Sequence, residues 1–180
     1  GSANATAGWT LPKVFRCPTS TRVSIAMSTY SHEGLIKGNY VGNFGSDTFM
    51  SFQSSTTAGP FGRVSISRIV PESMFGYGLG VRFTSILDGT SNTVLLSETV
   101  PQENTADGRG AWMWGGMGGT YFTTRNTPNS TTPDKIQACW TGSPSRFPCI
   151  QHQHAAADTA ASWGDLYAAA RSMHGGGVNA

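Results

Sequence analysis

Two histidines have the most metal-like spacing in this chain of 180 residues. His152 and His154 are separated by one residue, so on a strand both imidazoles would lie on the same face and could meet one ion. Asp158 follows closely, but no third ligand is fixed by the spacing. Because two ligands do not define a metal, we expect the pair to be solvent-exposed loop histidines instead. The sequence therefore predicts no bound transition metal.

Oxygen-bearing side chains around an Asp-Gly turn offer a second kind of site. The candidates are Asp88, Asn92 and Glu98, and calcium prefers carboxylate and carbonyl oxygens supplied by loops. The EF-hand spacing is absent, however, and a turn capped by its own side chains explains Asp88 and Asn92 without an ion. Calcium remains the alternative to our expectation that the chain needs no cofactor.

Four aromatic residues form a candidate binding face for sugar rings or for a partner protein. They are Trp112, Trp114, Tyr121 and Trp140. Trp112 and Trp114 are two residues apart, so on a strand they would share one face. The alternative is that this face packs into the core, because aromatic side chains dominate burial energy.

Signatures of catalysis and of nucleic-acid binding are missing from the sequence. It contains no Gly-x-Ser-x-Gly elbow, no His-Glu-x-x-His, no phosphate-binding loop and no dinucleotide fingerprint. The formal net charge is only +2, from 12 basic and 10 acidic residues without a basic cluster. This charge gives no electrostatic basis for binding nucleic acid. We therefore expect neither an enzyme nor a nucleic-acid-binding protein.

The three cysteines indicate one disulfide and one unpaired thiol. Cys139 and Cys149 stand ten residues apart in a polar, proline-rich stretch, which is a comfortable spacing for a disulfide. Two buried free thiols are the alternative, but neutral-surfaced β domains of this composition are often exported to oxidising compartments. Cys17 is left without a partner in this chain.

The elements that must position these residues are mostly strands. Charged residues are only 12% of the chain and 23 residues are glycine, which favours a turn-rich, strand-rich domain over a helical bundle. Apolar and extended patterns predict strands at residues 14–18, 23–30, 39–45, 64–70, 81–86, 94–99 and within 111–122.

The segments between these strands are predicted to be irregular. Residues 1–13 read as a loose lead-in, and residues 123–150 as a long loop that carries the disulfide. Residues 155–171 are alanine-rich and predict either one short helix or an irregular loop. We expect a single α+β domain over residues 1–180, mostly antiparallel β, with long loops and little helix.

A series of motifs gives the chain a family resemblance over nearly its whole length. The most specific blocks are Asp88-Gly89-Thr90-Ser91-Asn92-Thr93 and Arg171-Ser172-Met173-His174-Gly175-Gly176-Gly177-Val178-Asn179. Residues 14–18, 39–43, 59–62 and 95–98 precede or separate them in a fixed order. This order resembles a large prepilin-like family of planctomycete-type bacteria, whose C-terminus carries a His-x9-Asp-Gly motif. The motif residues in this chain are Asp88, Gly89, Asn92, Glu98, Arg171, His174 and Asn179.

The resemblance implies a structural role outside the cytoplasm. Such proteins are similar to type IV pilins and type II secretion pseudopilins, with a cleaved leader, a long apolar N-terminal helix and a β-rich head. The chain is therefore expected to be the head of a filament or pseudopilus subunit, facing the periplasm or the cell surface. The helix would anchor it in the inner membrane before assembly, and its partners would be copies of itself or other pilin-like subunits.

The chain departs from the family pattern at both ends. The long helix is not part of it, and it stops before the Asp-Gly half of the motif, so the sequence partner of His174 is missing. The resemblance also implies a cysteine just after the helix, which would be a partner for Cys17.

Overall fold

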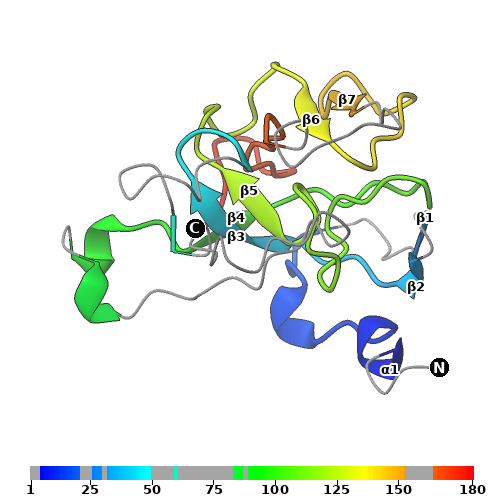
Figure 1. The fold of residues 1–180 in the computed structure, drawn as a ribbon, viewed down its shortest axis with the longest axis horizontal. Coiled ribbons are helices and arrows are strands. Elements are labelled where there is room, and N and C mark those ends of the chain that lie inside the picture. Colours follow the sequence, from blue (N-terminus) through cyan, green and yellow to red (C-terminus); the bar gives the residue numbers. More distant parts are fainter. Residues whose placement is uncertain are drawn as a thin grey trace.

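The computed structural model describes residues 5–20, 26–29, 32–49, 59–60, 83–86, 89–152 and 164–180. Over these residues the fold is β-rich with little helix, as the sequence predicts (Figure 1). The helical turns are α1 (Ala5–Gly8), η1 (Lys13–Phe15), η4 (Phe83–Ser85) and η5 (Thr90–Asn92). The strands are β1 (Met27–Thr29), β2 (His32–Leu35), β3 (Tyr40–Gly45), β4 (Leu96–Glu98), β5 (Tyr121–Thr123), β6 (Asp134–Ile136) and β7 (Cys149–Gln151).

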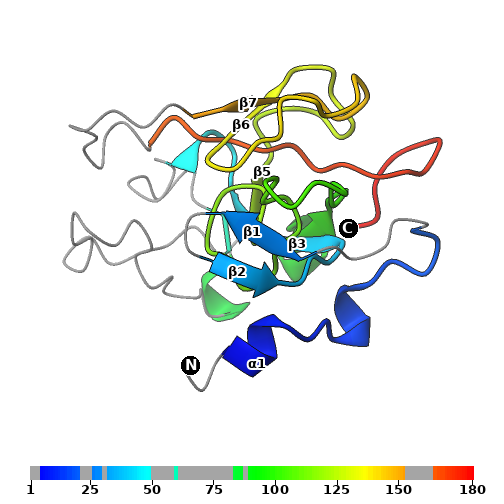
Figure 2. The ribbon, with the colours of Figure 1, turned by 90° about the vertical axis from the view of Figure 1, so that its right-hand side faces the viewer.

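The strands form three small sheets with mixed pairing. A central sheet has the order β4-β3-β5, in which β3 pairs antiparallel with β4 and parallel with β5. Strands β1 and β2 form an antiparallel pair, and β6 and β7 a parallel one. In both ribbon views the β6–β7 pair lies at the top and α1 at the bottom (Figures 1 and 2). Among the described residues, no helix has the length and apolar character needed to cross a membrane.

The main apolar core joins the central sheet to the C-terminal part of the chain. Phe44 of β3 is almost fully buried, stacks on Phe49 with ring centroids 4.7 Å apart, and meets Tyr121 edge-on at 5.3 Å. Ile136 of β6 and Leu166 belong to the same buried cluster. Aromatic contacts of this kind add to the free energy gained by burial, so this cluster ties β3, β5 and β6 together.

Two predicted strands are short 3-10 turns instead. The prediction for residues 14–18 is wrong where η1 occupies Lys13–Phe15, because Pro12 stands at the N-cap with φ −60° and starts a turn. Phe83–Ser85 forms η4 although residues 81–86 alternate in polarity, so alternation over a few residues did not decide the local structure. The predicted strand at 64–70 and the alanine-rich residues 155–163 lie outside the described residues.

Both segments predicted to be irregular contain regular structure. In the lead-in 1–13, Ala5–Gly8 forms α1 and Thr10 Oγ1 donates a hydrogen bond to the carbonyl of Thr6. The loop 123–150 contains β6 and the start of β7, and a disulfide joins Cys139 to Cys149, as predicted from their spacing. The disulfide closes the turn that leads into β7.

A buried ion network holds β6 against the C-terminal segment. Arg171 donates to both carboxylate oxygens of Asp134 at 2.7 and 2.8 Å, and Arg109 pairs with Asp107 at 2.7 Å. Arg109 also lies 3.8 Å from Asp134. The side chains of all four residues are at most 1% exposed. Since a buried charge is costly unless it is paired, each member depends on the others.

Lys37 is buried beside this network, and its titration should be visible in the stability of the domain. Its ammonium donates to the carbonyls of Gln102 and Asn104 at 2.8 and 2.7 Å. Burial lowers the pKa of Lys37 to about 8, against the opposing effect of Asp107. Between about pH 8 and pH 10 the unfolded chain therefore keeps a proton that the folded chain has lost, so stability rises with pH.

We expect the free energy of unfolding to rise by about 1–2 kcal/mol from pH 8 to pH 9.5 because of Lys37. Urea unfolding across this range measures it, and Lys37→Met should abolish the rise. Lys13→Met, at an exposed lysine, is the control and should keep it. Burial raises the pKa of Tyr121. Ionisation of this tyrosine therefore lowers the free energy of unfolding as the pH rises, but only at pH values above this window. A flat or falling profile in the unmodified chain would contradict this assignment.

Candidate functional site

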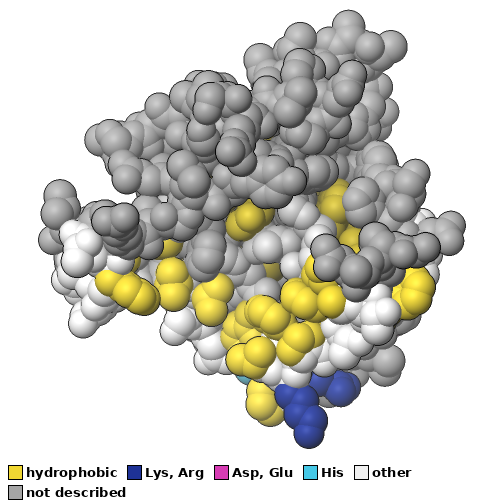
Figure 3. Space-filling view, turned by 60° about the horizontal axis from the view of Figure 1, so that its bottom comes forward, with side chains coloured by type: hydrophobic (Ala, Val, Ile, Leu, Met, Phe, Trp, Pro, Cys, Tyr) yellow, Lys and Arg dark blue, Asp and Glu magenta, His cyan; other side chains and the backbone are white. Residues whose placement is uncertain are grey.

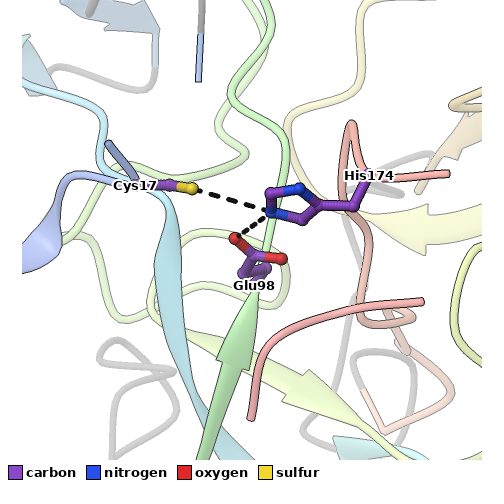
Figure 4. A group of neighbouring side chains, drawn as sticks. All are labelled: Cys17, Glu98 and His174. Atoms are coloured by element: carbon purple, nitrogen blue, oxygen red, sulfur yellow. Dashed lines mark hydrogen bonds and ion pairs between the residues drawn. The ribbon is translucent and has the colours of Figure 1, made fainter. Parts of the chain in front are cut away.

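Three side chains from distant parts of the sequence meet at the edge of the central sheet. They are Cys17, Glu98 and His174, and one ligand atom of each lies within 4.8 Å of the others (Figure 4). The ring Nε2 of His174 is 3.0 Å from Glu98 Oε1 and 3.7 Å from Cys17 Sγ. Cys17 and Glu98 are buried, and His174 is partly exposed. We call these three residues the Cys-Glu-His cluster.

The sheet fixes the first two members of the cluster. Glu98 ends β4 and stands opposite Tyr40 in the register of β3 and β4. Asn39, just before β3, accepts a hydrogen bond at 3.1 Å from the backbone N–H of Cys17 and donates to Ser20 Oγ. Asn39 therefore attaches the N-terminal segment to the start of the central strand and sets the position of the Cys17 sulfur.

The C-terminal segment brings the third member by folding back over β4. The backbone N–H of Arg171 donates to the Glu98 carbonyl at 2.8 Å. Asn129, in the left-handed region with φ 56°, accepts from the backbone N–H of Ser172 at 2.8 Å. Ser172 Oγ in turn accepts from the backbone N–H of His174 at 3.1 Å. This chain of contacts determines where the imidazole lies.

The Glu98 carboxylate is buried but densely hydrogen-bonded. It accepts from the backbone N–H of Asn179 at 3.0 Å and from Asn179 Nδ2 at 3.1 Å. Burial alone would raise its pKa, but the hydrogen bonds from Asn179, Cys17 and His174 outweigh that effect and hold the pKa of Glu98 below its ordinary value. Glu98 is therefore an anion in the folded domain at neutral pH.

Tyr40 borders the cluster on the side of β3. Burial, followed by the neighbouring Cys17 and Glu98, raises the pKa of the Tyr40 phenol. Its hydroxyl is hydrogen-bonded to Cys17, so it stays protonated and available as a donor. The surroundings of the Cys17 sulfur are thus polar, since Thr19 Oγ1 is also 3.2 Å away.

The geometry of the cluster differs from that of a catalytic triad. In a nucleophile–base–acid triad, the two partners engage opposite nitrogens of the histidine. Here Cys17 and Glu98 both contact Nε2 of His174, as the two dashed lines in Figure 4 show. Asn179 Nδ2 lies 3.2 Å from the same atom. The arrangement converges on one point, and thiol, imidazole and carboxylate groups that converge in this way are able to hold a metal ion.

A small pocket opens beside the cluster. Its volume of about 10 Å³ is close to that of one water-sized particle. The pocket is lined mainly by the cluster and by polar neighbours, namely Cys17, Thr19, Ser20, Asn39, Glu98, Thr99, Val100, Ser172, Met173 and His174. An opening of this size accommodates a water molecule or a single ion.

The structure does not test the two ion sites considered from the sequence, because Asp88 and His154 lie outside the described residues. Asn92 is exposed in η5, and Glu98 lies in the Cys-Glu-His cluster. His152, which we expected to be exposed, is buried with its Nδ1 3.8 Å from Asp165 Oδ1. Its position at the end of the β6–β7 pair explains the burial of His152, because the backbone N–H of His152 donates to the carbonyl of Ile136.

The four aromatic residues do not form one surface. Trp114 is buried in a cluster with Met27, and Tyr121 packs against a different cluster around Phe44. Trp112 stacks on Phe15 at 5.3 Å and donates to the Thr10 carbonyl. The prediction that Trp112 and Trp114 share a strand face is wrong, because this stretch forms turns closed by Thr120 Oγ1, which donates to both tryptophan carbonyls.

Sequence reasoning identified the members of the cluster singly but missed that they meet. Cys17, Glu98 and His174 each stand in a different motif block, and no spacing along the chain links them. The buried pairs of Asp107 with Arg109 and of Asp134 with Arg171 were not predicted either. One signal was present: the separate motif blocks supply a thiol, a carboxylate and an imidazole, which together are a ligand set.

Comparison with known proteins identifies the family of the chain. The model of the family SBP_bac_10, described as a protein of unknown function (DUF1559), matches residues 2–180. No curated protein and no solved structure gives a significant match.

Proposed function

Since this chain belongs to the SBP_bac_10 (DUF1559) family, we propose that it is the globular head of an exported, prepilin-like structural protein. The ordered motifs support this proposal, because they resemble prepilin-like proteins over nearly the whole chain. In the full protein a long apolar N-terminal helix would anchor the head in the inner membrane. Assembly would then place it in a filament or pseudopilus on the periplasmic or outer side.

The disulfide supports export. Cys139 and Cys149 are joined by a disulfide, and Cys139 is buried in the main apolar core. Disulfides of this structural kind form and persist in oxidising compartments and are rare in the cytosol. The bond therefore favours a periplasmic or cell-surface location for the domain.

The observation that carries the proposal is an apolar surface on the N-terminal segment. Trp9 and Val14 are 57% and 76% exposed, and Met113 is exposed beside Gly8. We call Trp9, Val14 and Met113 the N-terminal apolar face. Viewed from below, apolar side chains gather on this side of the molecule, with basic side chains at one rim (Figure 3). Exposed apolar patches mark sites of contact with another protein or with a membrane.

This face has the properties expected of a subunit contact. It lies on the segment that would follow a prepilin helix, so that helix, or the helix of a neighbouring copy, would pack against it. The low charge content of the chain favours such packing, because few charged groups would have to be desolvated at the contact. The proposed partners are therefore copies of this protein or other pilin-like subunits.

A structural role also agrees with the chemistry of the Cys-Glu-His cluster. Cys17 and Glu98 both contact the same imidazole nitrogen, which differs from the arrangement that activates a nucleophile through a base and an orienting acid. We therefore propose a non-catalytic function.

Immunogold electron microscopy of the full-length protein in its host tests the proposal. The expected result is label along surface filaments or in envelope clusters, recovered together with other pilin-like subunits after shearing. Trp9→Ser combined with Val14→Ser should reduce assembly while the purified head keeps its unfolding midpoint. Dispersed monomer in every growth state, or cytoplasmic label, would refute the proposed function.

A further inference from the structure

We propose that Cys17, Glu98 and His174 form a binding site for one zinc ion. This site differs from both ion sites considered from the sequence and departs from the expectation that the chain needs no cofactor. The inference does not depend on the filament role, because it rests on the contacts of the Cys-Glu-His cluster alone.

The first argument is that the Nε2 atom of His174 lies close to more polar atoms than it can hydrogen-bond at one time. The Nε2 atom is 3.0 Å from Glu98 Oε1, 3.7 Å from Cys17 Sγ and 3.2 Å from Asn179 Nδ2. A ring nitrogen either donates one hydrogen or accepts with one lone pair, so it makes one good hydrogen bond. A metal ion among these atoms would be bound by the nitrogen, the sulfur and the oxygen together.

The second argument is the spacing of the ligand atoms. Zinc binds thiolate sulfur at about 2.3 Å and imidazole nitrogen or carboxylate oxygen at about 2.0–2.2 Å. Around a tetrahedral ion such ligands lie about 3.3–3.6 Å apart. The distances of 3.0 and 3.7 Å at His174 Nε2 bracket this range. Both pairs that include His174 are therefore within a few tenths of an ångström of this range, and the third pair, Cys17 and Glu98, lies within 4.8 Å.

The third argument is the chemistry of the ligand set, which selects the metal. Calcium and magnesium prefer oxygen ligands throughout, whereas this set includes a thiol and an imidazole. Copper(I) prefers purely soft ligands, and a carboxylate is a hard one. One thiolate, one imidazole and one carboxylate are all accepted by zinc, so zinc fits the set best.

The fourth argument is that the ligands are already oriented by their neighbours. Asn179 holds both oxygens of Glu98, Ser172 holds the backbone at His174, and Asn39 holds the backbone at Cys17. Outer contacts of this kind fix ligand geometry in metal sites. The partly exposed imidazole gives an entry path, and the adjoining pocket has room for a water molecule as fourth ligand.

A zinc ion here would connect three segments that are far apart in sequence. Cys17 and His174 are separated by 157 residues, and Glu98 lies between them at the end of β4. Binding that occurs only in the folded state adds its free energy to folding. The ion would therefore fasten the N-terminal and C-terminal segments to the central sheet.

Metal titration of the 180-residue chain, with its disulfide intact and Cys17 as a free thiol, tests the site. Zinc chloride followed by calorimetry should show one ion per chain, and elemental analysis after gel filtration should recover it. Cobalt(II) used as a probe should give the ultraviolet charge-transfer band of a thiolate–cobalt bond. This band tests Cys17 directly in the unmodified chain, since the other two cysteines form the disulfide.

Substitutions distinguish the residues that would bind zinc from the residues that orient them. Glu98→Gln and Cys17→Ser should weaken zinc binding by more than the roughly 10–100-fold that loss of an outer-shell contact costs, and Asn179→Ala should cost about that amount. Glu103→Gln, at an exposed carboxylate, is the matched control and should bind like the unmodified chain. Circular dichroism without metal shows whether each variant is folded.

Three outcomes would overturn the inference. The first is the absence of stoichiometric zinc in the chain that keeps the disulfide and has Cys17 as a free thiol, and the second is a cobalt complex without the thiolate band. The third is a full-length protein in which Cys17 is recovered in a disulfide with a cysteine outside this chain. None of these results bears on filament assembly, so the failure of this inference is distinct from failure of the proposed function.

Discussion

Replacement of Asp134 by asparagine is expected to lower the free energy of unfolding by about 3–5 kcal/mol. The Asp134 carboxylate accepts two hydrogen bonds from Arg171 and a third from the backbone N–H of Ala169 at 2.9 Å, and it lies 3.8 Å from Arg109. Asparagine keeps the size but removes the charge, which takes away the ion pair of the buried Arg171 guanidinium and leaves Arg109 paired with Asp107. An uncompensated buried charge of this kind is among the most costly defects in a folded protein.

Urea unfolding of the variant and of a surface control measures this effect. Asp47→Asn removes a carboxylate that pairs with Arg125 where both side chains are well exposed, and we expect a change of about 0–1 kcal/mol. Equal, small effects of the two substitutions would show that the buried network does not hold β6 to the C-terminal segment.

Removal of the disulfide by the double change Cys139→Ser and Cys149→Ser is expected to cost about 3 kcal/mol. The bond spans ten residues, and its main effect is to restrict the unfolded chain, for which loop-closure entropy gives a value of this size. It also holds the turn before β7, so the loss should be measurable as a lower urea midpoint.

The reduced form of the unmodified chain is the natural control for this pair. Treatment with a reductant should bring its urea midpoint to that of the double variant and leave the double variant unchanged. A double variant as stable as the oxidised chain would contradict a structural role for the bond, and would remove this support for export.

Local patterns predicted the elements that are defined by local chemistry. The aromatic and apolar residues of 39–45 predicted β3, and the buried pattern of 94–99 predicted β4. The ten-residue spacing in a polar loop predicted the disulfide between Cys139 and Cys149. In each of these cases the determining residues are neighbours in sequence.

Elements that depend on tertiary contacts could not be predicted in this way. Strands β6 and β7 run parallel and pair only because the intervening chain returns to the start of β6 and brings Cys149 opposite Asp134, within a stretch that is polar and rich in turn residues. Trp112 and Trp114 alternate as in a strand, but Thr120 closes a turn on their carbonyls and sends Trp114 into the core.

In the candidate site, too, the residues could be identified from the sequence but their arrangement depends on tertiary contacts. The sequence identified Cys17, Glu98 and His174 as motif residues, but their meeting depends on the pairing of β3 with β4 and on the return of the C-terminal segment. Nothing in their spacing encodes an approach between residues 76 to 157 positions apart. The ligand set therefore became visible only when the topology was known.

The central claim, that this domain is a subunit head that packs through its N-terminal apolar face, is tested most directly by cross-linking in the host. A photoreactive amino acid at Val14 of the full-length protein should give a ladder of cross-linked subunits. The same group at Ile150, which is exposed on β7 at the opposite end of the molecule, should give far less. A monomer band alone at Val14, or equal ladders at both positions, would contradict the claim.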